Sequence, residues 1–241
     1  MTAPLAPLPE GLVATRESLR TMACYVVAPA RRAVDGHIGL RPTPGGFGTP
    51  PVGEPPLEVR IEGASIVVER GGRASRAPVT TLAAAAELAG VGLDPDPGVG
   101  VDLPPFDPAA TLAVDDTAAA VLGDWYALGA EVLASVGATG PGSLSEATLW
   151  PEHFDLAAVH HGGDPHDGSR TANIGFSPGD AGSPDPYLYV GPWEPDGLDD
   201  PFWNVSFGAR LDHAELAQAA DPSVAALAFI GRGLALLADR G

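Results

Sequence analysis

The stretch LEVRIEGASIVVER, residues 57–70, contains two β-rich runs, LEVRIE and SIVVER, separated by Gly63-Ala64, and in the first run apolar and polar side chains alternate. Alternation with a period of two is typical of half-buried β-strands. A two-residue spacer that contains glycine is typical of a tight hairpin turn. Residues 57–62 and 65–70 are therefore predicted to pair as antiparallel strands, and Gly71-Gly72 is predicted to turn the chain once more.

Helices are predicted on both sides of this hairpin. Upstream, a helix is expected to start near Thr15, a suitable N-cap, and to stop before Pro29. Downstream, TTLAAAAELAG (80–90) predicts a short helix with a threonine cap and a terminal glycine. Residues 15–90 are thus expected to form an N-terminal α+β half, preceded by an arm of residues 1–14.

The rest of the chain repeats this mixture of helices and strands. Residues 91–112 are rich in proline and glycine and are predicted to connect two halves. Residues 113–241 open with a helix capped by Asp115 or Asp116. Four strands are predicted to follow as a β-meander, at 153–159, 172–176, 187–190 and 203–207. A capping box at 212–215 and a cap at Asp221-Pro222 predict helices at the C-terminus, so the fold class is α+β.

The composition excludes several classes of function. All 13 basic residues are arginine, and they face 31 carboxylates, which gives a net charge of −18. Such a charge repels nucleic acid and anionic membranes, so neither is an expected partner. The lack of lysine excludes Schiff-base chemistry and a phosphate-loop lysine. Cys24 is alone, so no intrachain disulfide can form.

No apolar run approaches the roughly 18 to 20 residues that cross a bilayer, and the N-terminus does not resemble a secretory signal. We therefore expect a cytoplasmic protein.

Four of the six histidines lie within residues 149–168, LWPEHFDLAAVHHGGDPHDG. On an extended segment, side chains two residues apart share a face, so His153 and Asp155 are predicted to lie side by side. Such a pair can transfer a proton, with the carboxylate orienting the imidazole, or can bind a metal. The alternative is a pair of polar side chains that only satisfy each other's hydrogen bonds.

His160, His161 and His166 are weaker candidates for metal binding. They lie in or beside a loop with two glycines and a proline, and metal ligands usually belong to rigid elements. The helical His-Glu-x-x-His motif of zinc proteases is absent. No metal is predicted, and the sequence identifies no cofactor.

The predicted meander combines aromatic and polar residues in the way that is typical of small-molecule sites. The candidate binding residues are Asn173, Ser177, Tyr187, Tyr189, Trp203 and Asn204. Asp180 is a further candidate catalytic residue, in combination with the pair at 153 and 155. The alternative interpretation is that Pro-Gly-Asp forms a turn and the aromatic residues form part of the core.

Several segments resemble those of an uncharacterised group of actinobacterial proteins and, more distantly, a wider bacterial family of unknown function. They are RPTPGGFGTP (41–50), LWPEHFDLA (149–157), NIGFSPGD (173–180), PYLYVGPW (186–193) and PFWN (201–204). The resemblance covers most of the chain from Thr15 onward and implies no activity, cofactor or catalytic residue.

The leading hypothesis is a small-molecule pocket in the C-terminal meander, with His153 and Asp155 giving polar specificity. A second hypothesis is a hydrolase or lyase in which His153 is the general base and Asp155 orients it, with or without a metal. A third is an acidic module that attracts a basic protein partner. The sequence does not decide whether the protein is an enzyme, and it does not predict an oligomeric state.

Overall fold

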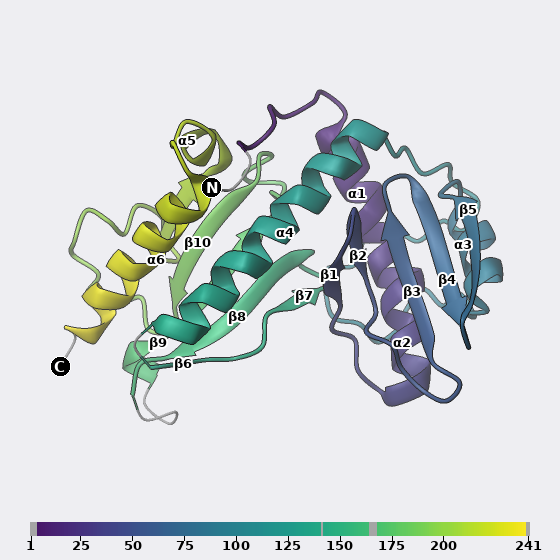
Figure 1. Ribbon diagram of the computed structural model, residues 1–241, viewed down its shortest axis with the longest axis horizontal. Coiled ribbons are helices and arrows are strands. Elements are labelled where there is room, and N and C mark those ends of the chain that lie inside the picture. The colour runs from purple at the N-terminus through teal and green to yellow at the C-terminus, as the bar shows by residue number, and fades with distance from the viewer. Residues whose placement is uncertain (1–3, 141, 164–167, 240–241) are drawn as a thin grey trace. The chain divides into compact units, whose positions relative to one another are not determined.

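The computed structural model describes residues 4–140, 142–163 and 168–239 of an α+β protein with two antiparallel sheets (Figure 1). The chain forms two compact units. The N-terminal unit comprises residues 8–127 and 148–155, and the C-terminal unit comprises residues 1–7, 128–147 and 156–241. The Pro/Gly-rich segment 91–112 lies wholly in the N-terminal unit.

The sheet of the N-terminal unit is a continuous antiparallel meander in the order β1-β2-β3-β4-β5. Its strands are β1 (Arg41–Thr43), β2 (Gly46–Gly48), β3 (Leu57–Glu62), β4 (Ser65–Arg70) and β5 (Arg73–Pro78). The hairpin predicted from residues 57–70 is confirmed, with Glu62 paired to Ser65 across Gly63-Ala64. Alternate residues of β3 are buried, as the sequence pattern requires.

The first helix of this unit differs from the prediction. It starts at Leu12 and continues to Asp35 as α1 (Leu12–Met22), a π-helical segment (Ala23–Val27) and α2 (Ala28–Asp35). The predicted stop before Pro29 is wrong: a wider π-helical turn ends at Val27, and Pro29 is the second residue of α2, in the first helical turn, where its missing N–H is tolerated. Thr15 is not the N-cap either: it is buried within α1, and its hydroxyl accepts a hydrogen bond from the N–H of Asp115.

The two helices that follow have the predicted caps. The hydroxyl of Thr81 accepts from the N–H of Ala84 at the start of α3 (Leu82–Ala89), and Gly90 ends that helix in a left-handed conformation. The carboxylate of Asp115 accepts from Ala118 at the start of α4 (Asp116–Thr139). By length and apolar character α4 could span a membrane, but 61% of its most apolar window is buried inside the protein, as in an ordinary core helix.

The sheet of the C-terminal unit has the order β11-β10-β9-β8-β6, and all its pairs are antiparallel. Its strands are β6 (Ser143–Leu144), β8 (Asp155–His161), β9 (Thr171–Ser177), β10 (Tyr187–Pro192) and β11 (Ala209–Asp212). A 3₁₀ turn (Gly168–Arg170), α5 (His213–Ala217) and α6 (Pro222–Ala238) complete the unit. The short strand β7 (Thr148–Trp150) belongs to the N-terminal unit, where Leu149 pairs with Leu40.

The strand predicted at 203–207 is wrong, and the last strand is β11 instead. Val205 and Gly208 bond to each other through both backbone groups, which closes a turn within the predicted strand. The capping box at 212–215 and the cap at Asp221 are confirmed.

One face of the C-terminal sheet, the inner face, belongs to the apolar core. Leu156, Phe176, Leu188 and Val190 are fully buried there. Residues of α4 and α6 lie against this face: a Cβ atom on Gly129 would be 2.8 Å from the Phe176 ring, and one on Gly233 would be 3.3 Å from Val190. The opposite face, here called the outer face, carries the polar and aromatic residues that the sequence singled out.

Candidate functional site

The register of β8, β9, β10 and β11 fixes which side chains share the outer face. Residues directly opposite each other in antiparallel strands project to the same side. Three successive rows follow from the pairing: Ala157, Gly175, Tyr189 and Arg210; then Val159, Asn173 and Gly191; then His161 and Thr171. The N–H of Trp193 donates to the carbonyl of Thr171, so Trp193 extends the third row.

Three aromatic rings form a cluster at one end of this face. The ring centroids of Tyr187, Tyr189 and Phe207 lie 6.2 to 6.4 Å from one another. The guanidinium of Arg210 lies 5.6 Å from the Tyr187 centroid, in cation–π range. Phe207 is 42% exposed and presents its ring to solvent, whereas Tyr187 is buried.

Trp193 forms a second aromatic group on the same face. Its side chain is 53% exposed. The indole Nε1–H donates to Oδ1 of Asn173 at 3.0 Å, and the His161 ring lies edge-on at 6.2 Å. The indole is therefore held in a defined orientation although it is exposed.

Gly191 lies between these two aromatic groups and contributes no side chain to the face. A Cβ atom on Gly191 would meet Phe207 O at 3.5 Å, Tyr189 Cδ2 at 3.8 Å and Asn173 O at 3.9 Å, which are ordinary contacts. The backbone of Gly191 does not adopt a positive φ, so glycine is not required there by conformation. The position above Gly191, next to Tyr189, Phe207 and Asn173, is here called the Gly191 gap.

Asp180 and Ser177 organise the turn beside the cluster. The carboxylate of Asp180 accepts the N–H groups of Gly182 and Ser183 and, at 2.8 Å, the hydroxyl of Tyr187. Ser177 Oγ accepts from Gly179 N. These bonds are typical of an Asx turn that fixes an aromatic side chain. Asp180 thus has a positioning role in this turn.

The structure brings together some of the predicted binding residues and separates others. Asn173, Ser177, Tyr187 and Tyr189 share the outer face, as the register requires. Asn204 instead extends the edge of β11, because its side-chain amide bonds to both backbone groups of Arg210. Trp203 packs edge-on against Phe202, whose ring also contacts Phe229 of α6.

His153 and Asp155 belong to the N-terminal unit and do not share a face. The predicted extended conformation is wrong here, because Phe154 between them has a φ of 56° and β8 begins only at Asp155. As a result His153 is exposed in a turn and Asp155 is buried. The proton-transfer dyad that we expected from side chains two apart therefore loses its geometric basis.

The left-handed turn at Phe154 is held from inside the unit. The hydroxyl of Tyr126 donates to the Phe154 carbonyl at 2.6 Å, and the Phe154 ring packs edge-on against Phe47 and Tyr126. Burial, and then the charge of Asp155, raise the pKa of Tyr126 well above its ordinary value. Tyr126 is therefore a neutral hydrogen-bond donor.

The histidines proposed as weak metal candidates are also separated. His160 and His161 are adjacent on β8 and project to opposite faces; His160 is buried and His161 lies on the outer face. His166 lies outside the described residues. In the part of the chain that the structure describes, no three His, Cys, Asp or Glu side chains are close enough together to hold a metal ion.

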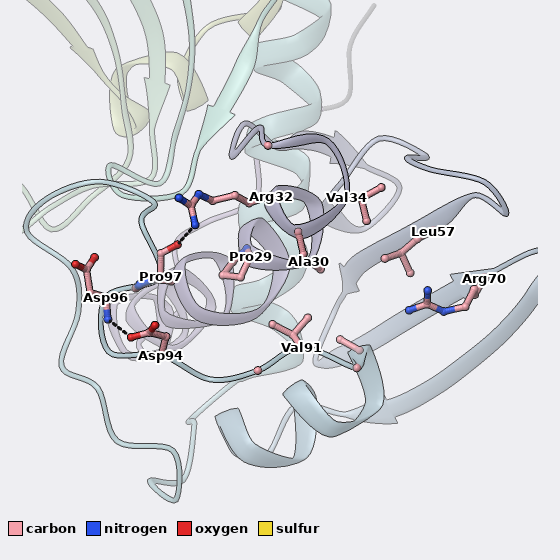
Figure 2. Close-up of a pocket in the computed structure, with 15 residues that line it drawn as sticks. Pro29, Ala30, Arg32, Val34, Leu57, Arg70, Val91, Asp94, Asp96 and Pro97 are labelled. Atoms are coloured by element: carbon pink, nitrogen blue, oxygen red, sulfur yellow. Dashed lines mark hydrogen bonds between the residues drawn. The ribbon is translucent and has the colours of Figure 1, made fainter.

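The N-terminal unit contains a cavity of about 700 Å³ that was not expected from the sequence (Figure 2). Residues of α2, the paired ends of β3 and β4, the end of α3 and residues 91–97 form its walls. Arg32, Arg70, Asp94 and Asp96 contribute charges, and Pro29, Ala30, Leu57 and Val91 contribute apolar surface. Part of the lining comes from the Pro/Gly-rich segment 91–112, which we expected to be only a connector, and no local sequence pattern indicates that this segment lines a cavity.

Comparison of the chain with protein-family models, with curated proteins and with solved structures found no match.

Proposed function

We propose that the C-terminal unit binds a small planar organic molecule, neutral or cationic, on the outer face of its sheet at the Gly191 gap. The observation that carries this proposal is the missing side chain at Gly191 between two exposed aromatic groups. Trp193 and Phe207 are exposed, and covering their rings with a ligand removes apolar surface from water, which favours binding.

The aromatic composition supports a planar ligand. Tyr189 and Trp193 are four residues apart on one face of an extended chain, which corresponds to roughly 13 Å. Aromatic pairs prefer centroid separations of about 4.5 to 7 Å, so one ring system in the gap can contact both side chains. A flat ligand would therefore lie above Gly191 with aromatic contacts on two sides.

The local charge supports a neutral or cationic ligand. The carboxylates of Asp180 and Asp212 border the aromatic cluster, and the Arg210 guanidinium is bonded to Asp212 at 3.0 Å. The faces of aromatic rings attract cations, and the chain carries a net charge of −18. An anionic ligand is disfavoured by both effects.

Asn173 offers a polar contact at the edge of the gap. Its Oδ1 accepts from Trp193, and no described residue accepts a hydrogen bond from its exposed amide nitrogen. An acceptor on the ligand would fit this donor and would orient the ring relative to Trp193.

The test is a titration of the full-length protein with three indoles that differ only in charge: tryptamine, indole and indole-3-acetate. Binding is measured by saturation-transfer NMR in wild type and in Gly191→Val. Valine suits a strand and fills the gap, so the fold is retained while the ligand site is lost. Gly231→Val is the matched control, since Gly231 is exposed on α6 with open space around it.

We expect tryptamine and indole to bind more tightly than indole-3-acetate, with binding lost in Gly191→Val and kept in Gly231→Val. Binding of tryptamine that survives in Gly191→Val would refute the site. Preferential binding of the acetate would refute the ligand class.

A further inference from the structure

We propose that the cavity of the N-terminal unit is a second binding site, specific for a small organic carboxylate with an apolar body. This inference does not depend on the proposed function, because the two sites lie in different units and are tested with different probes.

The arginines of the N-terminal unit differ in whether a carboxylate lies within ion-pair distance. In the N-terminal unit, six arginines lie within 4 Å of a carboxylate: Arg16, Arg20, Arg31, Arg41, Arg60 and Arg76. The other three, Arg32, Arg70 and Arg73, have no described carboxylate within that distance.

Two of these three arginines belong to the cavity, and the third lies next to one of them. Arg32 and Arg70 both line the cavity. Arg73 is directly opposite Arg70 in the β4–β5 ladder, across the Gly71-Gly72 turn, so both project to the same face. Like charges at directly opposed strand positions destabilise a sheet. An anion bound beside Arg70 would remove that repulsion.

Apolar surface lies between the two cationic groups of the cavity. Figure 2 shows Arg32 and Arg70 on either side of Pro29, Ala30 and Val91. A volume of about 700 Å³ lies within the range of roughly 300 to 1,000 Å³ that is typical of small-molecule sites. A ligand with an apolar body would cover this surface and place its charged end at an arginine.

The aspartates determine which end of the cavity takes the carboxylate. Asp94 and Asp96 accept backbone N–H groups of their own loop, and Arg32 donates to the carbonyl of Pro97 in that loop. The Arg32 end therefore contains compensating negative charge. At the other end, Arg73 lies beside Arg70, and among the described residues no carboxylate lies within ion-pair distance of the Arg70 guanidinium. We assign the ligand carboxylate to Arg70.

The experiment is a calorimetric titration of the full-length protein with octanoate, below the concentration at which it forms micelles. Octan-1-ol tests the need for the charge, and inorganic phosphate tests the need for the apolar body. Arg70→Gln removes the assigned partner. Arg76→Gln is the matched control, because Arg76 lies on the same hairpin and already pairs with Glu62 at 3.0 Å.

We expect octanoate to bind, octanol and phosphate to bind at least about 10-fold more weakly, and Arg70→Gln to weaken octanoate binding about 10-fold or more. Arg76→Gln should leave the affinity within about twofold of wild type. Absence of octanoate binding, equal binding of octanol or phosphate, or equal binding by Arg70→Gln would overturn the proposal.

A stability measurement separates a binding role from a structural one. Without ligand, Arg70→Gln should unfold at the same temperature as wild type or at a higher one, because a like-charge pair is removed. With octanoate, only wild type and Arg76→Gln should gain thermal stability. A lower unfolding temperature of ligand-free Arg70→Gln would show that Arg70 is structural and would contradict the assignment.

Discussion

The ring of Tyr189 lies over the backbone of Gly175 on the neighbouring strand, so closely that a Cβ atom on Gly175 would be 2.6 Å from Cζ and Oη of Tyr189. A side chain at Gly175 must therefore displace the ring. We expect Gly175→Ala to lower the free energy of unfolding by about 1 kcal/mol, the low end of the range for overpacking, because the ring can swing toward solvent. Urea unfolding measures this difference.

Gly191→Ala is the control for that substitution, since its Cβ would make only ordinary contacts. We expect it to change the free energy of unfolding by less than about 0.5 kcal/mol. If Gly175→Ala and Gly191→Ala lowered the free energy of unfolding equally, the packing of Tyr189 on Gly175 would be contradicted.

The hydroxyl of Tyr126 should be essential for the left-handed turn at Phe154. Tyr126→Phe keeps the ring contacts but leaves the buried Phe154 carbonyl without this donor. We expect the free energy of unfolding to fall by about 1 to 3 kcal/mol, as for other buried hydrogen bonds that lose one partner. Chemical denaturation tests this, and an unchanged midpoint and slope would show that the bond contributes nothing.

His213 should make the protein less stable in mild acid. Burial lowers its pKa in the folded state below the ordinary value of 6.5, with a smaller opposing effect of Asp185. The unfolded chain then binds more protons than the folded one, so this stabilising contribution is complete above pH 6.5 and is lost as the pH falls toward the lowered pKa. The slope is at most about 1.4 kcal/mol per pH unit.

His213→Gln cannot titrate, so the difference in unfolding free energy between it and wild type should shrink between pH about 7.5 and about 5.5. A difference that does not change with pH would show that His213 is protonated equally in both states.

Cys24 should be inert in the folded protein. It is fully buried, its Sγ contacts the carbonyl of Pro151 at 3.1 Å, and burial raises its pKa to about 12. The reactive thiolate is therefore nearly absent at neutral pH. We expect no labelling by iodoacetamide in buffer and complete labelling in denaturant, measured by mass spectrometry. Rapid labelling of the native protein would contradict the burial of this side chain.

The sequence predicted the features that depend on local patterns. The hairpin at 57–70, the cap at Thr81 and the capping box at 212–215 follow from alternation, cap chemistry and turn residues, and all are confirmed. The outer-face set of Asn173, Ser177, Tyr187 and Tyr189 was also predictable, because a period of two determines which side chains share a face once the register is known.

The failures occurred where tertiary contacts override local patterns. The helix continues through Pro29 because a π-helical turn precedes it, and such a turn has no local sequence signal. Phe154 adopts a positive φ that is rare for a bulky residue, and the Tyr126 hydroxyl 28 positions away holds it there. The cavity combines residues 29–36 with residues 57, 70 and 89–97, a juxtaposition that requires the folded sheet.

The most direct test of the proposed ligand site follows the indole N–H resonance of Trp193 in ¹⁵N-labelled protein during titration with unlabelled tryptamine. The chain has four tryptophans, and the resonance is assigned by its loss in Trp193→Phe. We predict a saturable shift of the Trp193 resonance in wild type and none in Gly191→Val. A Trp193 resonance that stays in place while tryptamine binds, or that shifts equally in Gly191→Val, would contradict the assignment of the Gly191 gap as the binding site.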